Sequence, residues 1–250
     1  MLALENVVAG YIPGVDILRG VSLRVEDGEM ICLVGPNGAS KSTVLRAISG
    51  LIKVSSGSVI FKNVSIAGRR PDQILAAGIA HIPQGHSVFP RMTVHENLLM
   101  GAYSLRDRGI VQARLAEVCD LFPLLKERAR EKAGNLSGGQ QKILEMGRAL
   151  MLKPPLMMLD EPSLGLAPKT MAKLFDTIQE LNRTGLTILM VEQNARQGLA
   201  ASHRGYVLEL GKERFEGRAH ELLESPEMAK LYLGGSTENG GSYRRRSEVA

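Results

Sequence analysis

The chain has 250 residues, enough for one large α/β domain or two small ones, and 44% of them are hydrophobic, which is sufficient to bury a core. This composition excludes a disordered or fibrous protein. Lysine and arginine exceed aspartate and glutamate by 31 to 26, but aromatic residues make up only 4% and tryptophan is absent, so we expect no nucleic-acid partner.

Nothing in the sequence predicts a membrane span, a secretion signal or a disulfide framework. No apolar run approaches the roughly 18 to 20 residues of a transmembrane helix, and the N-terminus lacks the basic and apolar segments of a signal peptide. Cys32 and Cys119 each lie in an apolar segment and are expected to be core thiols. We therefore expect a cytosolic location.

The first third of the chain predicts β-strands around a phosphate-binding loop. Apolar residues alternate over residues 2–7, a Gly/Pro turn follows at 11–14, and residues 17–25 complete an antiparallel pair. Residues 30–34 form a continuous apolar run typical of a buried strand, and helical spacing follows at 42–49. Further elements are predicted as a strand at 57–66, a helix at 71–77 and a strand at 79–83.

A helical insertion is predicted next, over residues 93–132. Thr93 followed by Glu96 is a capping pattern, residues 110–125 place apolar side chains at helical spacing, and Pro123 predicts a break. Another helix is predicted from near Gln140. We therefore expect a helical subdomain over about residues 93–150.

From residue 155 onward the alternation of strands and helices returns. Strands are predicted at 156–159 and 186–191, helices at 169–182 and 195–200, and a closing hairpin at 205–215. Such alternation predicts an α/β fold with a mainly parallel sheet and helices on both faces, beside the N-terminal antiparallel β subdomain. Residues 1–233 are expected to form one domain, and the Gly/Ser-rich, charged residues 234–250 a disordered tail.

The loop after the strand at 30–34 nearly matches the P-loop pattern. It reads Gly35-Pro36-Asn37-Gly38-Ala39-Ser40-Lys41-Ser42. In such a loop, backbone N–H groups surround a phosphate at a helix N-terminus, the lysine adds charge and the hydroxyl holds magnesium. The pattern has glycine where this chain has Ser40, and a Cβ there costs about 1 to 3 kcal/mol if the backbone needs positive φ. The site is predicted, and its affinity for nucleotide is left open.

Two carboxylates, Asp160 and Glu161, end the apolar strand at 156–159. In a nucleotide-hydrolysing α/β sheet, an aspartate at the end of a neighbouring strand holds the metal, and an adjacent glutamate can accept the proton of the attacking water. The alternative is that the pair caps the following helix.

Residues 136–140 read Leu-Ser-Gly-Gly-Gln, which can open a helix and present N–H groups to a phosphate. Taken alone, this stretch could equally be a flexible helix cap. In order with the phosphate loop and the Asp160-Glu161 pair, it makes the chain resemble the ATP-binding subunits of ABC transporters over about residues 2–233. The resemblance implies the P-loop NTPase fold of an ABC-type nucleotide-binding domain.

The resemblance also implies that the chain binds ATP and Mg²⁺ and hydrolyses ATP. It implies that Tyr11 stacks on adenine, although the residue alone could be an ordinary strand tyrosine. It further implies that residues 35–43, up to Thr43, bind the phosphates and that the magnesium ligands are Ser42, Gln84 and Asp160. The implied catalytic residues are Glu161, Gln84 and Gln193. The γ-phosphate held by a second subunit would be bound by Ser137, Gly138, Gly139 and Gln140.

Partners and location follow from the same resemblance. Because the two half-sites cannot close within one chain, it implies a dimer with a second ATP-binding subunit, either another copy or a related chain. It also implies that the chain binds transmembrane permease subunits and, through them, acts with a solute-binding protein outside the membrane. The implied location is peripheral, on the cytoplasmic face of the cell membrane.

Two departures from the common pattern indicate a subgroup. Gln193 stands where most of these ATPases have a histidine, and residues 163–168 read Ser-Leu-Gly-Leu-Ala-Pro without the usual aspartate. Both strings are similar to the LivF type of subunit in branched-chain amino acid importers. Gln84-Gly85-His86 is also similar to urea and short-amide importers. Two further alternatives are a nucleotide-binding subunit whose hydrolysis is impaired by Ser40, and a non-transport ABC ATPase acting on nucleic acid or ribosomes.

Overall fold

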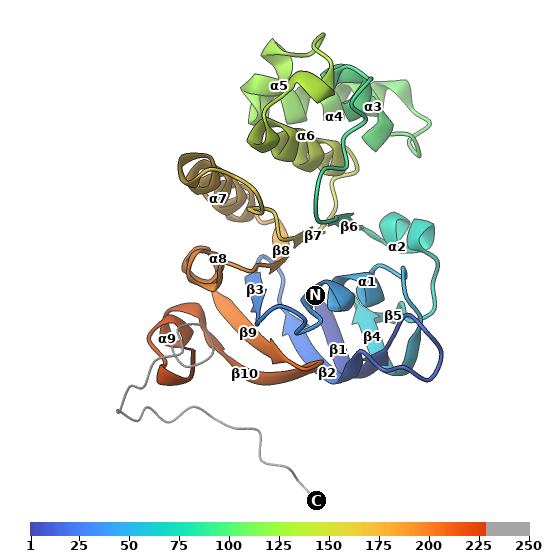
Figure 1. Cartoon of the computed structure of the whole chain (residues 1–250). Coiled ribbons are helices and arrows are strands. Elements are labelled where there is room, and N and C mark those ends of the chain that lie inside the picture. Colours follow the sequence, from blue (N-terminus) through green and yellow to red (C-terminus); the bar gives the residue numbers. More distant parts are fainter. Residues whose placement is uncertain (229–250) are drawn as a thin grey trace, which may run out of the picture.

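A six-stranded sheet forms the centre of the fold in the computed structural model, which describes residues 1–228 (Figure 1). Its order is β10-β9-β3-β8-β7-β6, and all neighbours are parallel except the last hairpin, β9 and β10. The strands are β3 (Met30–Val34), β6 (Ile79–Ile82), β7 (Leu156–Asp160), β8 (Thr187–Val191), β9 (Arg204–Glu209) and β10 (Lys212–Arg218). The predicted mainly parallel sheet is confirmed.

A second, antiparallel sheet lies against one face of the first. Its order is β2-β1-β4-β5, with β1 at Leu2–Ala9, β2 at Leu18–Val25, β4 at Val54–Phe61 and β5 at Val64–Ser65. The single strand predicted over residues 57–66 is therefore wrong. The chain turns at Lys62 and Asn63, whose φ angles of 48° and 63° are left-handed and incompatible with a continuous strand.

Both faces of the central sheet are buried, as the continuous apolar runs predict. Ile31 and Leu33 of β3 pack with the antiparallel sheet and with α1 (Lys41–Ile48) and α2 (Pro71–Ala77). Met30 and Cys32 of the same strand belong to the opposite core. That core includes α7 (Pro168–Arg183), α8 (Ala195–Ala201) and α9 (Ala219–Leu223). The expected helices on both faces are therefore present.

The helices of residues 94–150 gather at one edge of the central sheet, at the top of Figure 1. They are α3 (Val94–Gly101), α4 (Arg108–Leu121), α5 (Pro123–Glu127), a 3₁₀ turn at Ala133–Asn135 and α6 (Gly138–Leu150). Thr93 caps α3 together with Glu96, as predicted. Pro123 begins α5 after Phe122 leaves the helical conformation, so the predicted break is confirmed.

The two cysteines differ in environment. Cys32 is fully buried, whereas Cys119 on α4 is half-buried and packs at the margin of the core, so the expectation of two core thiols holds only for Cys32. Among residues 1–228, none of the helices combines the length and the apolar character that crossing a bilayer requires. The tail predicted at 234–250 lies outside the described residues.

Candidate active site

The loop between β3 and α1 is shaped by close backbone packing. A Cβ on Gly35 would lie 2.3 Å from the carbonyl oxygen of Leu208, so only glycine fits where the loop leaves the sheet. The Lys41 ammonium folds back over the loop and donates to the carbonyl oxygens of Gly35, at 2.9 Å, and Pro36, at 3.3 Å. The Lys41 charge is therefore held at the loop, beside the N-terminus of α1, whose first N–H groups have no partner within the helix.

Ser40, the residue that departs from the P-loop pattern, has φ 71° and ψ 24°. This left-handed conformation is the one for which the pattern's glycine is suited, and it costs a serine about 1 to 3 kcal/mol. Its hydroxyl donates to the carbonyl oxygen of Gly38 at 3.4 Å. The loop is formed in spite of this cost.

A hydroxyl and a carboxylate meet at the start of α1. Ser42 Oγ donates to Asp160 Oδ1 at 2.7 Å, which joins α1 to the end of β7. Burial raises the pKa of Asp160, and the Ser42 hydrogen bond opposes this shift. Burial likewise lowers the pKa of Lys41, and the charges of Glu161 and Asp160 oppose it.

This donor set fits magnesium better than a transition metal. Within the described residues, no three His, Cys, Asp or Glu side chains are grouped so as to hold a metal by themselves. Mg²⁺ is instead bound by one or two oxygen ligands of the protein together with phosphate and water oxygens. The adjacent oxygens of Ser42 and Asp160 match that requirement.

The second carboxylate, Glu161, meets the predicted glutamine. Gln84 follows β6 and donates its side-chain amide to Glu161 Oε2 at 2.8 Å. The backbone of Glu161 has φ 46°, and its N–H donates to the carbonyl oxygen of Val191 on β8. Because α7 begins at Pro168 with Ala167 as its N-cap, the alternative that Asp160 and Glu161 cap this helix is wrong.

A buried contact that the sequence analysis missed joins the loops after β7 and β8. Ser163 donates its N–H and its hydroxyl to the Glu192 carboxylate, at 3.1 and 2.9 Å. Glu192 is 1% exposed, and burial raises its pKa. The contact fixes the loop after Glu161 relative to Gln193. The one sequence signal was that Glu192 directly follows the apolar strand β8 and that Ser163 comes three residues after the end of β7.

The phosphate loop and the loops after β6, β7 and β8 surround a cavity of about 400 Å³. Leu164 belongs to its lining although the sequence analysis did not select it, and it is an exposed hydrophobic side chain, 47% accessible. Of the predicted loop residues, Ala39 packs into the core instead. The lining residues are Asn37, Gly38, Ser40, Lys41, Ser42, Thr43, Gln84, Glu161, Leu164 and Gln193.

Tyr11 lies beside the cavity rather than in its wall. It follows the end of β1, and its hydroxyl is 3.3 Å from Thr43 Oγ1. Arg46 donates to the same hydroxyl at 3.0 Å, and its guanidinium lies 5.7 Å from the centre of the ring. Tyr11 therefore contacts α1 through its hydroxyl group and lies outside any regular strand. Half of its surface is accessible to a ligand.

Residues 137–140 lie apart from the cavity at Lys41. Ser137 caps α6: its hydroxyl accepts from the N–H of Gln140, and its own N–H donates to the Gln140 side chain. A Cβ on Gly139 would lie 2.2 Å from Thr170 Cγ2, so a larger residue there would force Thr170 to shift where α6 meets α7. Ser137, Gly139 and Gln140 line a cavity with Lys173, and within residues 1–228 no lining residue is common to it and the cavity at Lys41.

Comparison with known proteins agrees with this geometry. A family model described as ABC transporter matches residues 18–164. The chain is 43% identical to the high-affinity branched-chain amino acid transport ATP-binding protein BraG of Pseudomonas aeruginosa, over 94% of this chain and 100% of that protein. It is 40% identical to the probable branched-chain amino acid transport ATP-binding protein LivF of Archaeoglobus fulgidus, over 94% and 99%.

A solved structure has the same fold over nearly the whole chain. It is the ADP conformation of MJ1267, an ATP-binding cassette of an ABC transporter, with a TM-score of 0.85 and 31% identity. The match covers 94% of this chain and 99% of that one.

Proposed function

Because the chain belongs to the ABC transporter family, we propose that it binds and hydrolyses ATP to power the import of branched-chain amino acids through separate permease subunits. The observation that carries this proposal is that one cavity gathers a lysine, a hydroxyl, two glutamines and a carboxylate, the groups that hydrolysis of a triphosphate needs. The names of the similar transport proteins support the class of solute.

The triphosphate binds at the loop between β3 and α1. The N–H groups at the start of α1 and the positive end of its dipole favour an anion there. Lys41 exchanges the carbonyl oxygens of Gly35 and Pro36 for oxygens of the β- and γ-phosphates, because an ammonium group has three donors and no acceptor. Tyr11, attached to α1 through Thr43, is the proposed contact for adenine.

Ser42, Asp160 and Gln84 are the proposed magnesium ligands. The 2.7 Å contact between Ser42 and Asp160 already brings two of these oxygens together. When bound, the ion neutralises part of the charge on the phosphates.

Glu161 is the proposed general base. A water molecule held between Glu161 and the γ-phosphate loses its proton to the carboxylate as its oxygen bonds to phosphorus. The bond from this phosphorus to the bridging oxygen breaks, and ADP and inorganic phosphate are the products. Gln84 orients the carboxylate, and Gln193 can donate an amide hydrogen bond to the phosphate without carrying charge.

A second ATP-binding subunit completes each site. Ser137, Gly138 and Gly139 open α6, and the cavity lined by Ser137 and Gly139 is separate from the one at Lys41, which supports their proposed role toward a nucleotide held by another chain. The ABC transporter cassette MJ0796, which is 27% identical to this chain, is dimeric. The partner is a second copy of this chain or a related subunit.

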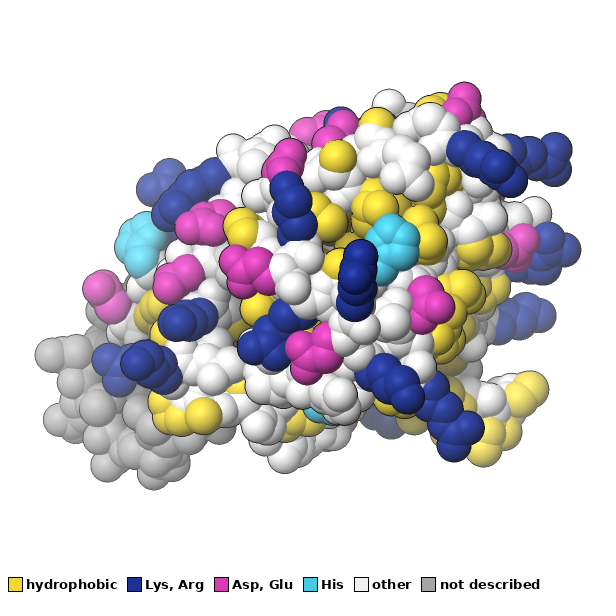
Figure 2. Space-filling model, turned by 90° about the horizontal axis from the view of Figure 1, so that it is seen from above, with side chains coloured by type: hydrophobic (Ala, Val, Ile, Leu, Met, Phe, Trp, Pro, Cys, Tyr) yellow, Lys and Arg dark blue, Asp and Glu magenta, His cyan; other side chains and the backbone are white. Residues whose placement is uncertain are grey.

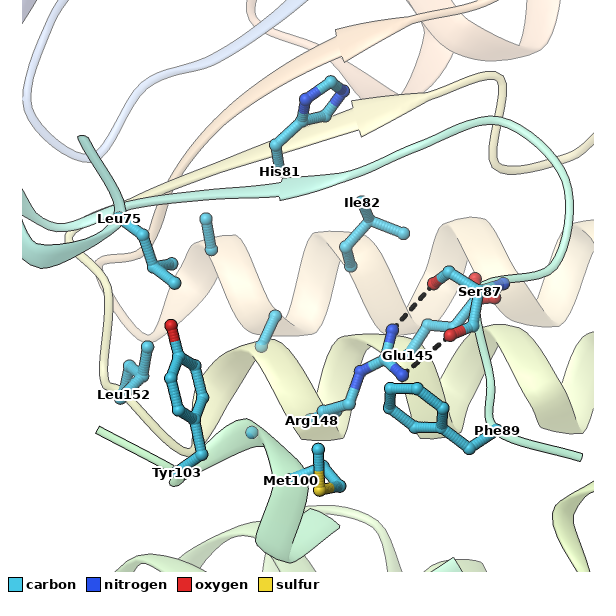
Figure 3. Close-up of a pocket in the computed structure, with 13 residues that line it drawn as sticks. Leu75, His81, Ile82, Ser87, Phe89, Met100, Tyr103, Glu145, Arg148 and Leu152 are labelled. Atoms are coloured by element: carbon cyan, nitrogen blue, oxygen red, sulfur yellow. Dashed lines mark hydrogen bonds between the residues drawn. The ribbon is translucent and has the colours of Figure 1, made fainter. Parts of the chain in front are cut away.

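An apolar groove beside β6 supports the proposed contact with a permease subunit (Figure 3). Its volume is about 290 Å³, and it is bordered by the exposed side chains of Phe89, Met100 and Tyr103. Viewed from above, hydrophobic side chains lie exposed among charged ones (Figure 2). We infer that a cytoplasmic segment of the permease fills this groove, and we propose with it that the chain lies at the inner face of the membrane.

The left-handed backbone at Ser40 supports a second candidate, a subunit that binds nucleotide while a paired ATPase carries out hydrolysis. Titrating the full chain with nucleotide and measuring its turnover, beside a Ser40→Gly variant, separates the two. Faster turnover in the variant than in the natural chain favours the second candidate, and equal turnover removes it.

The transport proposal is tested by ATP hydrolysis of the full chain reconstituted with its permease subunits. We expect hydrolysis to rise when the solute-binding protein carries leucine, isoleucine or valine. A rise with urea or short amides alone transfers the proposal to that class of importer. Retention of the chain on ribosomes or DNA in place of permease subunits contradicts transport.

A further inference from the structure

A buried ion pair lies on α6, one turn after the residues that open this helix. Lys142 Nζ and Glu145 Oε2 are 2.8 Å apart, and the two residues are 3% and 1% exposed. Taking two charges out of water costs more than their attraction returns unless further hydrogen bonds satisfy them. The position of those further bonds therefore indicates what the pair does.

Both charges bind the loop that follows Gln84. Lys142 donates to the carbonyl oxygen of Gly85, and the second oxygen of Glu145 accepts the N–H of Ser87. One turn further along α6, Arg148 donates to the carbonyl oxygen and to the hydroxyl of Ser87, at 2.7 and 2.8 Å (Figure 3).

The same loop is fixed again at its far end. Phe89 lies 5.2 Å from the Arg148 guanidinium, measured to the ring centre, and exchanges two backbone hydrogen bonds with the buried side chain of Asn97 on α3. Residues 85–89 are thus held by side chains of the helices at the top of Figure 1.

At its other end the loop begins next to Gln84, which lines the cavity at Lys41. Gly85, whose carbonyl oxygen Lys142 binds, is covalently joined to Gln84, and Gln84 donates to Glu161. Only the Gly85 Cα and one peptide group separate the carbonyl that Lys142 binds from the Cα of Gln84, so a displacement of Lys142 can shift the residue whose amide orients the proposed base. Displacements of about 1 Å at such positions can cost about 100-fold in rate.

We propose that Lys142 and Glu145 are positioning residues for hydrolysis, which hold the loop of residues 85–87 so that the Gln84 amide stays on Glu161. This inference rests on the proposed role of Glu161 as the base. It also makes α6 a rigid connection from Ser137 and Gly139, which serve the partner's nucleotide, to Gln84 of the chain's own site.

The test is a double variant of the full chain, Lys142→Met with Glu145→Leu. It removes both contacts to the loop and both charges of the pair together, and replacing a whole buried pair by apolar residues is commonly neutral for stability. The matched control is Arg114→Met with Glu117→Leu on α4, an ion pair at the same spacing that is 26% and 52% exposed. Glu145→Gln alone serves as the second variant if the double one does not fold.

We expect kcat of the double variant to fall about tenfold or more, with KM and the affinity for ADP within twofold, and amide hydrogen exchange at residues 84–89 to become faster. Glu145→Gln gives a smaller loss of the same kind, and the control pair stays at the rate of the natural chain. In a Gln84→Ala background the double change adds no further loss, because both act through the same side chain.

Unchanged kcat and unchanged exchange at residues 84–89 in the double variant overturn the inference. A loss that is fully additive with Gln84→Ala also overturns it. Absence of hydrolysis by the natural chain, alone and with its permease, contradicts the proposed function instead, and the exchange measurement still decides whether the pair holds the loop.

Discussion

Gln84 and Glu161 are joined by a 2.8 Å hydrogen bond, although 77 residues separate them in the chain. Each follows one of two adjacent parallel strands, β6 and β7, so the register of the sheet brings the two side chains to the same edge. Substitutions of Glu161, in the phosphate loop, on α6 and on β6 give four predictions.

Glu161→Gln removes the proposed base and keeps the size of the side chain. We expect kcat for ATP hydrolysis to fall at least about 100-fold, the range for loss of a general base, while the affinity for ADP stays within about twofold. Steady-state hydrolysis and ADP titration measure the two quantities. An unchanged rate would remove Glu161 from the mechanism.

Ser40→Gly relieves the left-handed backbone at the phosphate loop. The variant gains the freedom of glycine at φ 71° but also makes the unfolded chain more flexible. We expect the first effect to prevail and the free energy of unfolding to rise by about 1 kcal/mol. Denaturant unfolding measures it. A variant less stable than the natural chain would mean that the Ser40 hydroxyl stabilises the loop.

Gly139→Ala tests the contact between α6 and α7. The new methyl group would lie 2.2 Å from Thr170 Cγ2, so we expect a loss of about 1 to 3 kcal/mol in the free energy of unfolding. Thr170→Ser removes the opposing methyl group and should restore most of it. Gly138→Ala, whose Cβ has its nearest neighbour at 3.4 Å, is the matched control for stability.

His81 makes stability depend on acid pH. Burial, with a smaller contribution from the nearby charge of Arg46, lowers the pKa of His81 from 6.5 to about 4. Its Nδ1 is 3.1 Å from Ser49 Oγ, and within residues 1–228 its Nε2 is a buried atom with no hydrogen-bond partner.

The unfolded chain therefore binds a proton at His81 that the folded chain does not, between pH 6.5 and about 4. Stability attributable to His81 is full above this window and is lost as pH falls through it, by about 3 kcal/mol. His81→Gln should remove that part of the pH dependence. Unfolding titrations from pH 7 to 4 measure it, and parallel curves for both proteins would show that His81 does not titrate in this way.

The sequence by itself determined the features that depend on neighbouring residues. The strand, loop and helix around Lys41, the capping of α3 by Thr93 and the break at Pro123 all follow from backbone geometry within a few residues. The strand predicted at 57–66 failed for the same kind of reason. Lys62 and Asn63 take left-handed conformations in a short turn, and neither is a glycine that would have indicated it.

Only the tertiary structure decided which of these segments meet. Ser42 contacts Asp160 across 118 residues, Ser163 binds Glu192, and the residues after Ser137 line a cavity of their own. Lys142 and Glu145 could be recognised from their spacing as a helical pair, but their contact with residues 85–87 depends on how α6 packs beside β6. Sequence spacing determines local backbone shape, whereas strand order and helix packing determine which distant side chains touch.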